Sequence, residues 1–125
     1  MGVPTDRKYT KDHEWAKLEG GKVRVGITDF AQRELGDVVF IEVPAVGKVF
    51  KQGEGLSSVE SVKAVSDIYA PVSGSVVEVN SNLSANPDLI NSSPFDDAWI
   101  AIIEPSQVNE LDALMDAQSY DALIG

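Results

Sequence analysis

The sequence predicts a single, mainly β domain: a small sandwich or flattened barrel of antiparallel strands with a helical C-terminal segment. Short runs rich in Val and Ile are punctuated by ten Gly and six Pro, a spacing typical of short strands joined by turns. The chain has 125 residues, the size of one ordinary domain. Its composition, 43% hydrophobic and 24% charged, is that of a folded chain, and no linker or low-complexity segment divides residues 1–125.

The first third is predicted to contain a hairpin, a short helix and a strand. Residues 13–27 hold a Gly-Gly pair between two arms, and the second arm alternates apolar with polar or small side chains. The next segment predicts a two-turn helix with Thr28 as its N-cap and Gly36 ending it. A strand over 38–44 follows and ends at a proline.

The middle of the chain is predicted to form two β arms around the turn Ser61–Ala64, followed by a strand at 75–79. The turn has no Gly or Asn at its apex, which disfavours a primed turn and favours type I. Residues 46–50 and 72–77 share a pattern of Val and Gly on either side of this turn. That weak repeat favours two β units related by a pseudo-twofold axis.

The last third is predicted to hold one buried strand between two helical stretches. Residues 83–91 predict a short helix capped by Asn86. The apolar run at 98–105 predicts a buried strand. The tail, about residues 106–124, has a helical apolar period and predicts a C-terminal helix capped by Ser106.

The net charge of -10 is unevenly distributed along the chain. All ten Lys and Arg side chains lie at or before Lys63, and residues 64–125 carry only acidic charges. Phosphate backbones and anionic lipids repel such a surface, so neither nucleic acid nor a membrane is an expected partner. The sequence has no Cys and one His, His13, which argues against disulfides, thiolate chemistry and a protein-built metal site.

Lys63 lies at the predicted apex of the central hairpin, a position that fits an ordinary solvated lysine. Its surroundings, VESVKAVSDIYAPVSG, resemble the hairpin of lipoyl and biotinyl carrier domains, where one lysine takes an amide-linked cofactor. More specifically, this string resembles the lipoylation site of glycine cleavage system H proteins. The segments YTKDHEW, VGITDFAQRELGDVVFIEVPAVG, INSSPFDDAWI and ELDALMDAQSYDAL also resemble H-protein segments, in family order, over about residues 8–124.

The resemblance implies a carrier rather than an enzyme, with a barrel-sandwich hybrid fold and no catalytic residues of its own. Lipoate joined to Lys63 would carry the aminomethyl group of glycine from a pyridoxal-phosphate glycine decarboxylase to a tetrahydrofolate-dependent aminomethyltransferase. Dihydrolipoyl dehydrogenase would then reoxidise the arm, and a lipoate ligase or transferase would attach it. A monomer is expected, because transient docking to several large enzymes suits a carrier.

The resemblance also implies roles for residues near Lys63. A cationic aminomethyl group calls for carboxylates in a partly dry groove, and motif position nominates Glu14 and Asp67 as this cradle. Alternatively, Glu14 is a solvated residue of the first hairpin and Asp67 is a charge at the edge of a strand. Family members vary at Glu34, so no pocket role is expected there, and His13 is expected to be structural or solvated. The lipoylating enzyme is expected to recognise the residues flanking the lysine: Glu60, Ser61, Val62 and Ala64.

Three alternatives remain open from the sequence. A biotinyl carrier typically has Met on both sides of its lysine, and this chain has Val62 and Ala64 there. An H-like protein that relays lipoyl groups to other complexes, and an unmodified scaffold, fit the same pattern. The start MGVPTDRKYT lacks a signal-peptide core and an Arg-rich leader, which favours a bacterial cytoplasm. A processed mitochondrial matrix protein would look similar.

Overall fold

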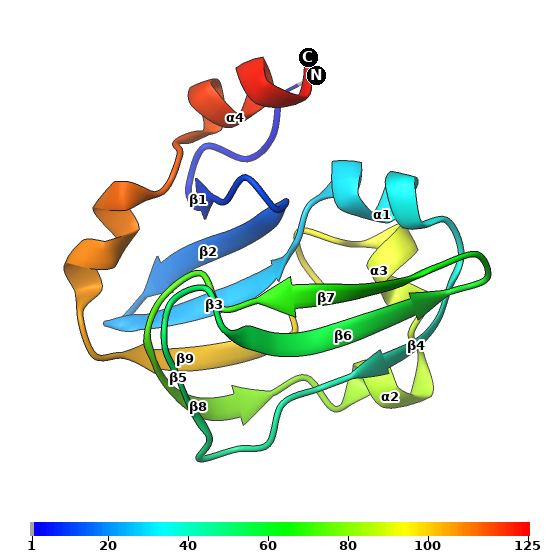
Figure 1. Cartoon of the computed structure of the whole chain (residues 1–125), viewed down its shortest axis with the longest axis horizontal. Helices are drawn as coiled ribbons and strands as arrows, with labels where there is room; N and C mark the ends of the chain where they lie inside the picture. The colour runs from blue at the N-terminus through cyan, green and yellow to red at the C-terminus, as the bar shows by residue number, and fades with distance from the viewer. Residues whose placement is uncertain (1) are drawn as a thin grey trace.

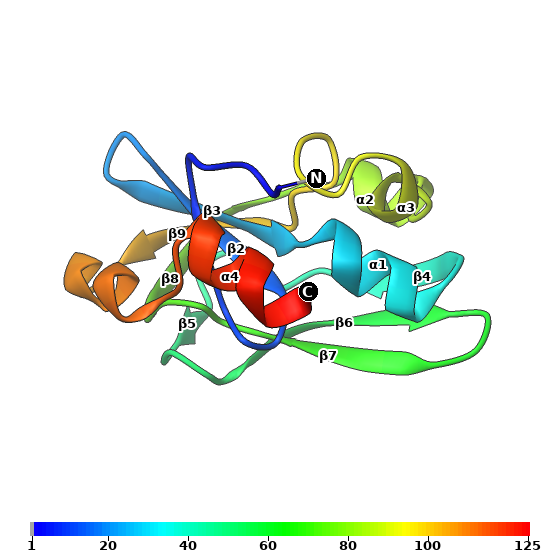
Figure 2. The ribbon, with the colours of Figure 1, turned by 90° about the horizontal axis from the view of Figure 1, so that it is seen from above.

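Two antiparallel sheets face each other in the structure, a computed structural model that describes residues 2–125 (Figures 1 and 2). The larger sheet has the strand order β1-β2-β3-β9-β8-β5, and the smaller has the order β4-β6-β7. The strands are β1 Lys8–Tyr9, β2 Glu14–Glu19, β3 Lys22–Ile27, β4 Val38–Glu42, β5 Val49–Phe50, β6 Gly55–Ser61, β7 Val65–Tyr69, β8 Gly74–Val79 and β9 Ala101–Pro105. The predicted mainly β fold is confirmed, as a flattened sandwich rather than a closed barrel.

Two features of the sequence shape the β2–β3 hairpin: the glycine pair in its turn and a glycine opposite Trp15. Gly20 and Gly21 both have positive φ, 57° and 80°, which a two-residue primed turn requires. Gly26 lies opposite Trp15, and a Cβ added there would stand 2.5 Å from the indole ring. Trp15 is fully buried, and its indole N–H lies within bonding distance of the carbonyls of Ile27 and Pro94. The strand pair therefore closes around a fixed indole.

The short helix after β3 has the predicted ends. In α1 (Asp29–Leu35), the Thr28 side chain accepts a hydrogen bond from the Ala31 N–H. Gly36 has φ of 78° and donates its N–H to the Gln32 carbonyl. Local capping chemistry was sufficient to predict both ends of this element.

Two helical predictions in the second half are wrong in detail. Residues 82–92 form two single-turn helices, α2 (Asn82–Ala85) and α3 (Leu89–Ser92). Asn86 caps the C-terminus of α2, where its N–H bonds the Asn82 carbonyl, and it caps no N-terminus. The predicted strands at 38–44 and 98–105 are shorter than expected, as β4 and β9.

The tail is not one continuous helix. It consists of a 3₁₀ helix, η1 (Val108–Ala113), and a separate helix, α4 (Ala117–Ile124). Between them, Met115 exchanges two backbone hydrogen bonds with Tyr9, at 2.8 and 2.9 Å, and this pairing holds the chain extended. Asp116, not Ser106, provides the side-chain cap, by accepting the Ser119 N–H.

Two apolar clusters hold these elements together. The larger lies between the sheets and includes Val25 and Ile103 from one sheet with Val59 from the other. The smaller attaches α4: Tyr9 and Tyr120 are fully buried and stack with ring centroids 4.8 Å apart. The N-terminal segment also contacts α4, where the Val3 N–H donates to the Asp121 carboxylate at 3.2 Å. No helix described within residues 2–125 is long and apolar enough to cross a membrane.

Candidate functional site

The tip of the β6–β7 hairpin is fixed by hydrogen bonds around Ser61. Its N–H donates to the Ala64 carbonyl, and its hydroxyl oxygen accepts from the N–H groups of Lys63 and Ala64, at 3.3 and 3.1 Å. The Val62 N–H donates to the Asp37 carbonyl, which ties the tip to the segment before β4. Neither Val62 nor Lys63 has a positive φ, so the turn is not a primed one, as the sequence predicts.

Lys63 is exposed at this tip, and its stem lies over the end of α1. A Cβ added to Gly36 would stand 3.5 Å from the Lys63 Cε. No ion pair found within residues 2–125 involves the Lys63 amine. The amine is therefore accessible, on a backbone held from both sides.

A cavity of about 280 Å³ opens beside the tip, between α1, β7 and the loop before β2. We call it the α1–β7 cavity. Its apolar lining is Ile27, Ala31, Leu35, Ala64, Val65 and Ile68, and its polar lining is Asp12, His13, Glu34 and Ser66. It is thus apolar along much of its wall and carries two carboxylates and one imidazole.

Glu14 is buried at the edge of β7. Its side chain accepts hydrogen bonds from the Thr10 hydroxyl, at 2.6 Å, and from the Tyr69 N–H, at 3.0 Å. Only 1% of Glu14 is exposed, and this burial raises the pKa of its carboxyl above the ordinary value, against the effect of both hydrogen bonds. Glu14 lines a second cavity, of about 370 Å³, which shares Asp12 with the α1–β7 cavity.

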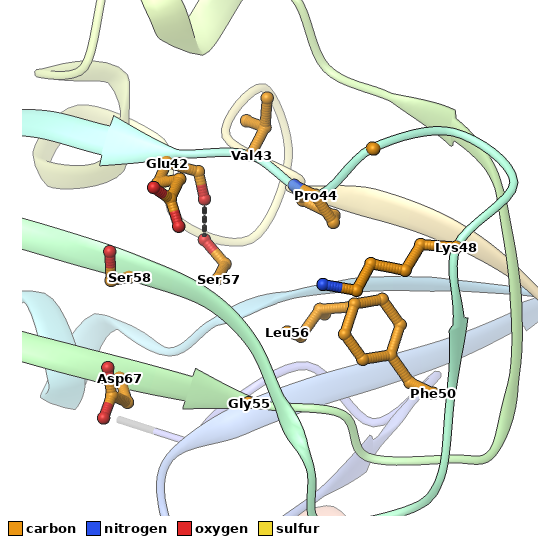
Figure 3. Close-up of a pocket in the computed structure, with 11 residues that line it drawn as sticks. Glu42, Val43, Pro44, Lys48, Phe50, Gly55, Leu56, Ser57, Ser58 and Asp67 are labelled. Carbon is orange, nitrogen blue, oxygen red and sulfur yellow. Dashed lines mark hydrogen bonds between the residues drawn. The ribbon is translucent and has the colours of Figure 1, made fainter.

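Asp67 lies on the opposite face of the hairpin. Asp67 is exposed and is not part of the lining of the α1–β7 cavity, whereas its neighbours Ser66 and Ile68 are partly or fully buried and line it. Asp67 pairs with Ser58 and lines a third cavity, of about 380 Å³ (Figure 3). The structure therefore does not bring Glu14 and Asp67 into one cradle.

Figure 3 also shows what else occupies that outer cavity. The Lys48 side chain runs along the Phe50 ring, with its amine 5.3 Å from the ring centroid. The Ser57 hydroxyl donates to the Glu42 carbonyl. This cavity is separated from Lys63 along the strands, because the Ser58–Asp67 pair lies two pairs further from the tip than Glu60–Val65.

The residues expected to be recognised around the lysine differ in their surroundings. Glu60, Val62 and Ala64 are exposed, and 69% of Val62 is accessible. Ser61 is buried and bonded within the turn. Its burial and its hydrogen bonds give Ser61 a role in holding the turn.

Comparison with known proteins identifies the family of this chain. The family model described as glycine cleavage H-protein matches residues 7–125. The chain belongs to the glycine cleavage H-protein family. It is 52% identical over 124 residues to the glycine cleavage system H protein of Geobacillus thermodenitrificans, covering 99% of this chain and 98% of that protein. It is 53% identical, with the same coverage, to the H protein of Oceanobacillus iheyensis.

A solved structure confirms the fold. The crystal structure of a glycine cleavage system H protein from Mycobacterium marinum matches with a TM-score of 0.90 and 42% sequence identity. The match covers 98% of this chain and 99% of that one. The family resemblance and the fold class predicted from the sequence are both confirmed.

Proposed function

We propose that this chain is the lipoyl-bearing carrier of a glycine cleavage system and that lipoate is attached to Lys63. The observation that supports it most is the exposed Lys63 amine at the apex of a fixed hairpin in an H-protein family chain. We assign no catalytic residue to the chain. Lipoate supplies the redox-active sulfur pair that takes up and releases the aminomethyl group.

The residues beside Lys63 fit such an arm. The Lys63 stem already lies against Gly36, next to the opening of the α1–β7 cavity. The apolar wall suits an aliphatic chain, and the carboxylates of Asp12 and Glu34 suit a cationic amine. With no Cys in the sequence, the host offers no thiolate that could form a mixed disulfide with the arm.

The cradle we propose differs from the one expected from motif position. Glu14 is retained, because its cavity adjoins the α1–β7 cavity at Asp12. Glu34 is added, because it lines the cavity nearest Lys63. We propose that Asp67 is not part of the cradle, because it lines the cavity on the outer face of the hairpin.

The proposed partners are those that the family resemblance implies. We propose glycine decarboxylase, aminomethyltransferase and dihydrolipoyl dehydrogenase as successive partners of a monomeric carrier. A lipoate ligase or transferase would recognise the exposed side chains of Glu60 and Val62 beside the acceptor amine. Ser61 contributes by holding the turn.

Intact-mass spectrometry tests the attachment. Protein produced with lipoate available should gain the mass of one lipoyl amide, and peptide mapping should place it on Lys63. A Lys63→Arg variant should stay unmodified and folded, whereas a matched Lys48→Arg variant should be modified like the wild type. A biotinyl mass, or no added mass on Lys63, would contradict the proposal.

A further inference from the structure

A chain of buried and partly buried hydrogen bonds connects the C-terminal helix to the α1–β7 cavity. The Tyr120 hydroxyl on α4 lies 2.8 Å from Nδ1 of His13 and 2.7 Å from the hydroxyl of Thr28. Thr28 and Tyr120 are fully buried, and Thr28 also accepts the Ala31 N–H as the cap of α1. His13 lines the cavity. Tyr120 thus connects α4 to the cavity wall.

His13 is held in an unusual backbone conformation for this contact. Its φ of 71° is the only positive value at a non-glycine residue within 2–125. Its N–H donates to the Thr10 carbonyl, its carbonyl accepts the Thr28 N–H, and its ring packs 4.6 Å from that of Phe30. Left-handed backbone at a non-glycine residue costs free energy, and it persists where the surroundings hold it.

The proton positions follow from the need to satisfy buried hydroxyls. If the Thr28 hydroxyl donates to Tyr120 and the Tyr120 hydroxyl donates to Nδ1 of His13, every proton in the chain has an acceptor. The reverse order makes Nδ1 the donor and leaves the buried Thr28 hydroxyl without an acceptor within residues 2–125. An unsatisfied buried donor is unfavourable, so the first order is preferred. The imidazole is then neutral, with its proton on Nε2.

We propose that Tyr120 is a positioning residue that holds His13 as a neutral Nε2–H donor in the α1–β7 cavity, which keeps that cavity negative for a cationic cargo. The inference rests on the proposed function for the identity of the cargo, and on the geometry alone for the state of His13. In this state Nε2 is the ring nitrogen left free to donate a hydrogen bond at the cavity wall. A protonated imidazole would instead offset one carboxylate and repel an ammonium group.

Burial and the neighbouring charges have opposite effects on the pKa of His13. Burial lowers the pKa of His13, whereas the negative charges of Asp12 and Glu34 act to raise it. Protonation would also force Nδ1 to donate and would reverse the chain of hydrogen bonds. The titratable groups that the structure places at the ring are Asp12 on its own loop, Glu34 on α1 and Tyr120 on α4.

The state of His13 can be measured directly in the protein before lipoylation. Imidazole ¹⁵N NMR at pH 7 should show an unprotonated, hydrogen-bonded Nδ1 and a protonated Nε2. In a Tyr120→Phe variant, the Nδ1 resonance should move to the position of a nitrogen without a hydrogen bond. An Nδ1–H tautomer or an imidazolium at pH 7 in the wild type would overturn the proposal, whether or not the variant folds.

Tyr9→Phe is the matched control for that variant. Tyr9 is as buried as Tyr120 and stacks on it, but its hydroxyl donates to the Pro4 carbonyl and does not touch His13. Removing it deletes a hydroxyl from the same cluster and should leave both His13 nitrogens unchanged. An equal change of the His13 resonances in both variants would show a general loosening of α4 and would contradict a specific role for Tyr120.

The cargo is tested separately on lipoylated protein. The His13 ring resonances should shift on lipoylation of Lys63, and the loaded Tyr120→Phe variant should lose its aminomethyl group roughly three- to ten-fold faster than the Tyr9→Phe variant. His13→Gln, which keeps a neutral N–H donor, should retain the group better than His13→Leu. Unshifted His13 resonances on a lipoylated chain would overturn this inference alone. An unmodified Lys63 would instead overturn the proposed function.

Discussion

Ser61 fixes the backbone that presents Lys63. Its side chain accepts two N–H groups of the turn, so the acceptor lysine is held by a residue two positions before it. Val62 and Lys63 themselves contribute no side-chain hydrogen bond to the turn. The accessibility of the amine and the rigidity of its backbone therefore depend on different residues.

A Ser61→Ala variant separates these two properties. Losing the hydroxyl should lower the free energy of unfolding by about 1 kcal/mol and slow enzymatic lipoylation severalfold, because the amine is no longer held in one orientation. Urea unfolding and the initial rate of lipoylation measure the two effects. Ser58→Ala, on the same strand, should change both little, and a Ser61→Ala protein modified at the normal rate would disprove this role.

Glu14 places a carboxyl group in the region between the two sheets. Its carboxylate satisfies an N–H of the edge strand β7, which explains why a carboxylate is found at a position with 1% exposure. Burial raises its folded-state pKa above the ordinary value of 4.5. The folded protein therefore binds this proton more readily than the unfolded chain does.

The pH dependence of stability tests this state of Glu14. Its stabilising contribution should be complete below the ordinary pKa of 4.5 and should be lost as pH rises through the raised folded-state value. The difference in free energy of unfolding between the wild type and Glu14→Gln should thus shift in favour of the wild type as pH falls from 7 to 4.5. A difference independent of pH over this range would show that the folded-state pKa is not raised.

At the scale of elements, local chemistry predicts some segments fully and others only in part. The α1 helix is predicted with both ends, because Thr28 and Gly36 act on their own neighbours. The break in the C-terminal tail is not predicted, because it depends on the pairing of Met115 with Tyr9, more than a hundred residues away. The apolar periodicity of the tail predicts which of its residues are buried, but it does not predict that a distant strand interrupts the helix.

The β2–β3 hairpin offers a sharp test of packing. Gly26→Ala should lower the free energy of unfolding by about 3 kcal/mol, because its Cβ would overlap the Trp15 indole, which is buried and fixed. Gly55→Ala is the matched control, since an added Cβ there meets nothing within 4 Å and its φ is not left-handed. Thermal and urea unfolding of both variants measure the difference. Equal stabilities would show that the indole moves aside.

At the scale of the whole molecule, the charge distribution gains a functional meaning. Acylation of Lys63 would remove the last cation of the sequence and move the formal net charge from -10 to -11. Every charge after the attachment point is then acidic. An acidic excess of this size favours fast, transient docking to enzymes with basic sites.

Ionic strength tests this docking. The apparent affinity for each partner enzyme should weaken severalfold between low and high salt, since exposed charges are screened over about 10 Å at 0.1 M. The KM for the lipoylated carrier, measured against salt, reports the effect, and a neutral solute at equal osmolality is the control. Salt-independent KM values would exclude electrostatic steering.

The sequence predicted the hairpin that carries Lys63, but it did not predict the residues that line the neighbouring α1–β7 cavity. The motif around Lys63 predicted the hairpin and its exposed lysine, because both are local. The α1–β7 cavity required Glu34 and His13 to meet β7 across the fold, and no spacing in the sequence encodes that meeting. Strand alternation relative to Ser66 could have placed Asp67 on the outer face, but only once the buried face of β7 was known.

The exchange of labelled bicarbonate into glycine, catalysed by glycine decarboxylase and dependent on the carrier, tests the proposed function most directly. Lipoylated wild-type protein should support exchange, whereas unlipoylated protein and folded Lys63→Arg should not. Exchange supported equally by Lys63→Arg, or none with a fully lipoylated wild type and an active decarboxylase, would contradict a carrier role centred on Lys63.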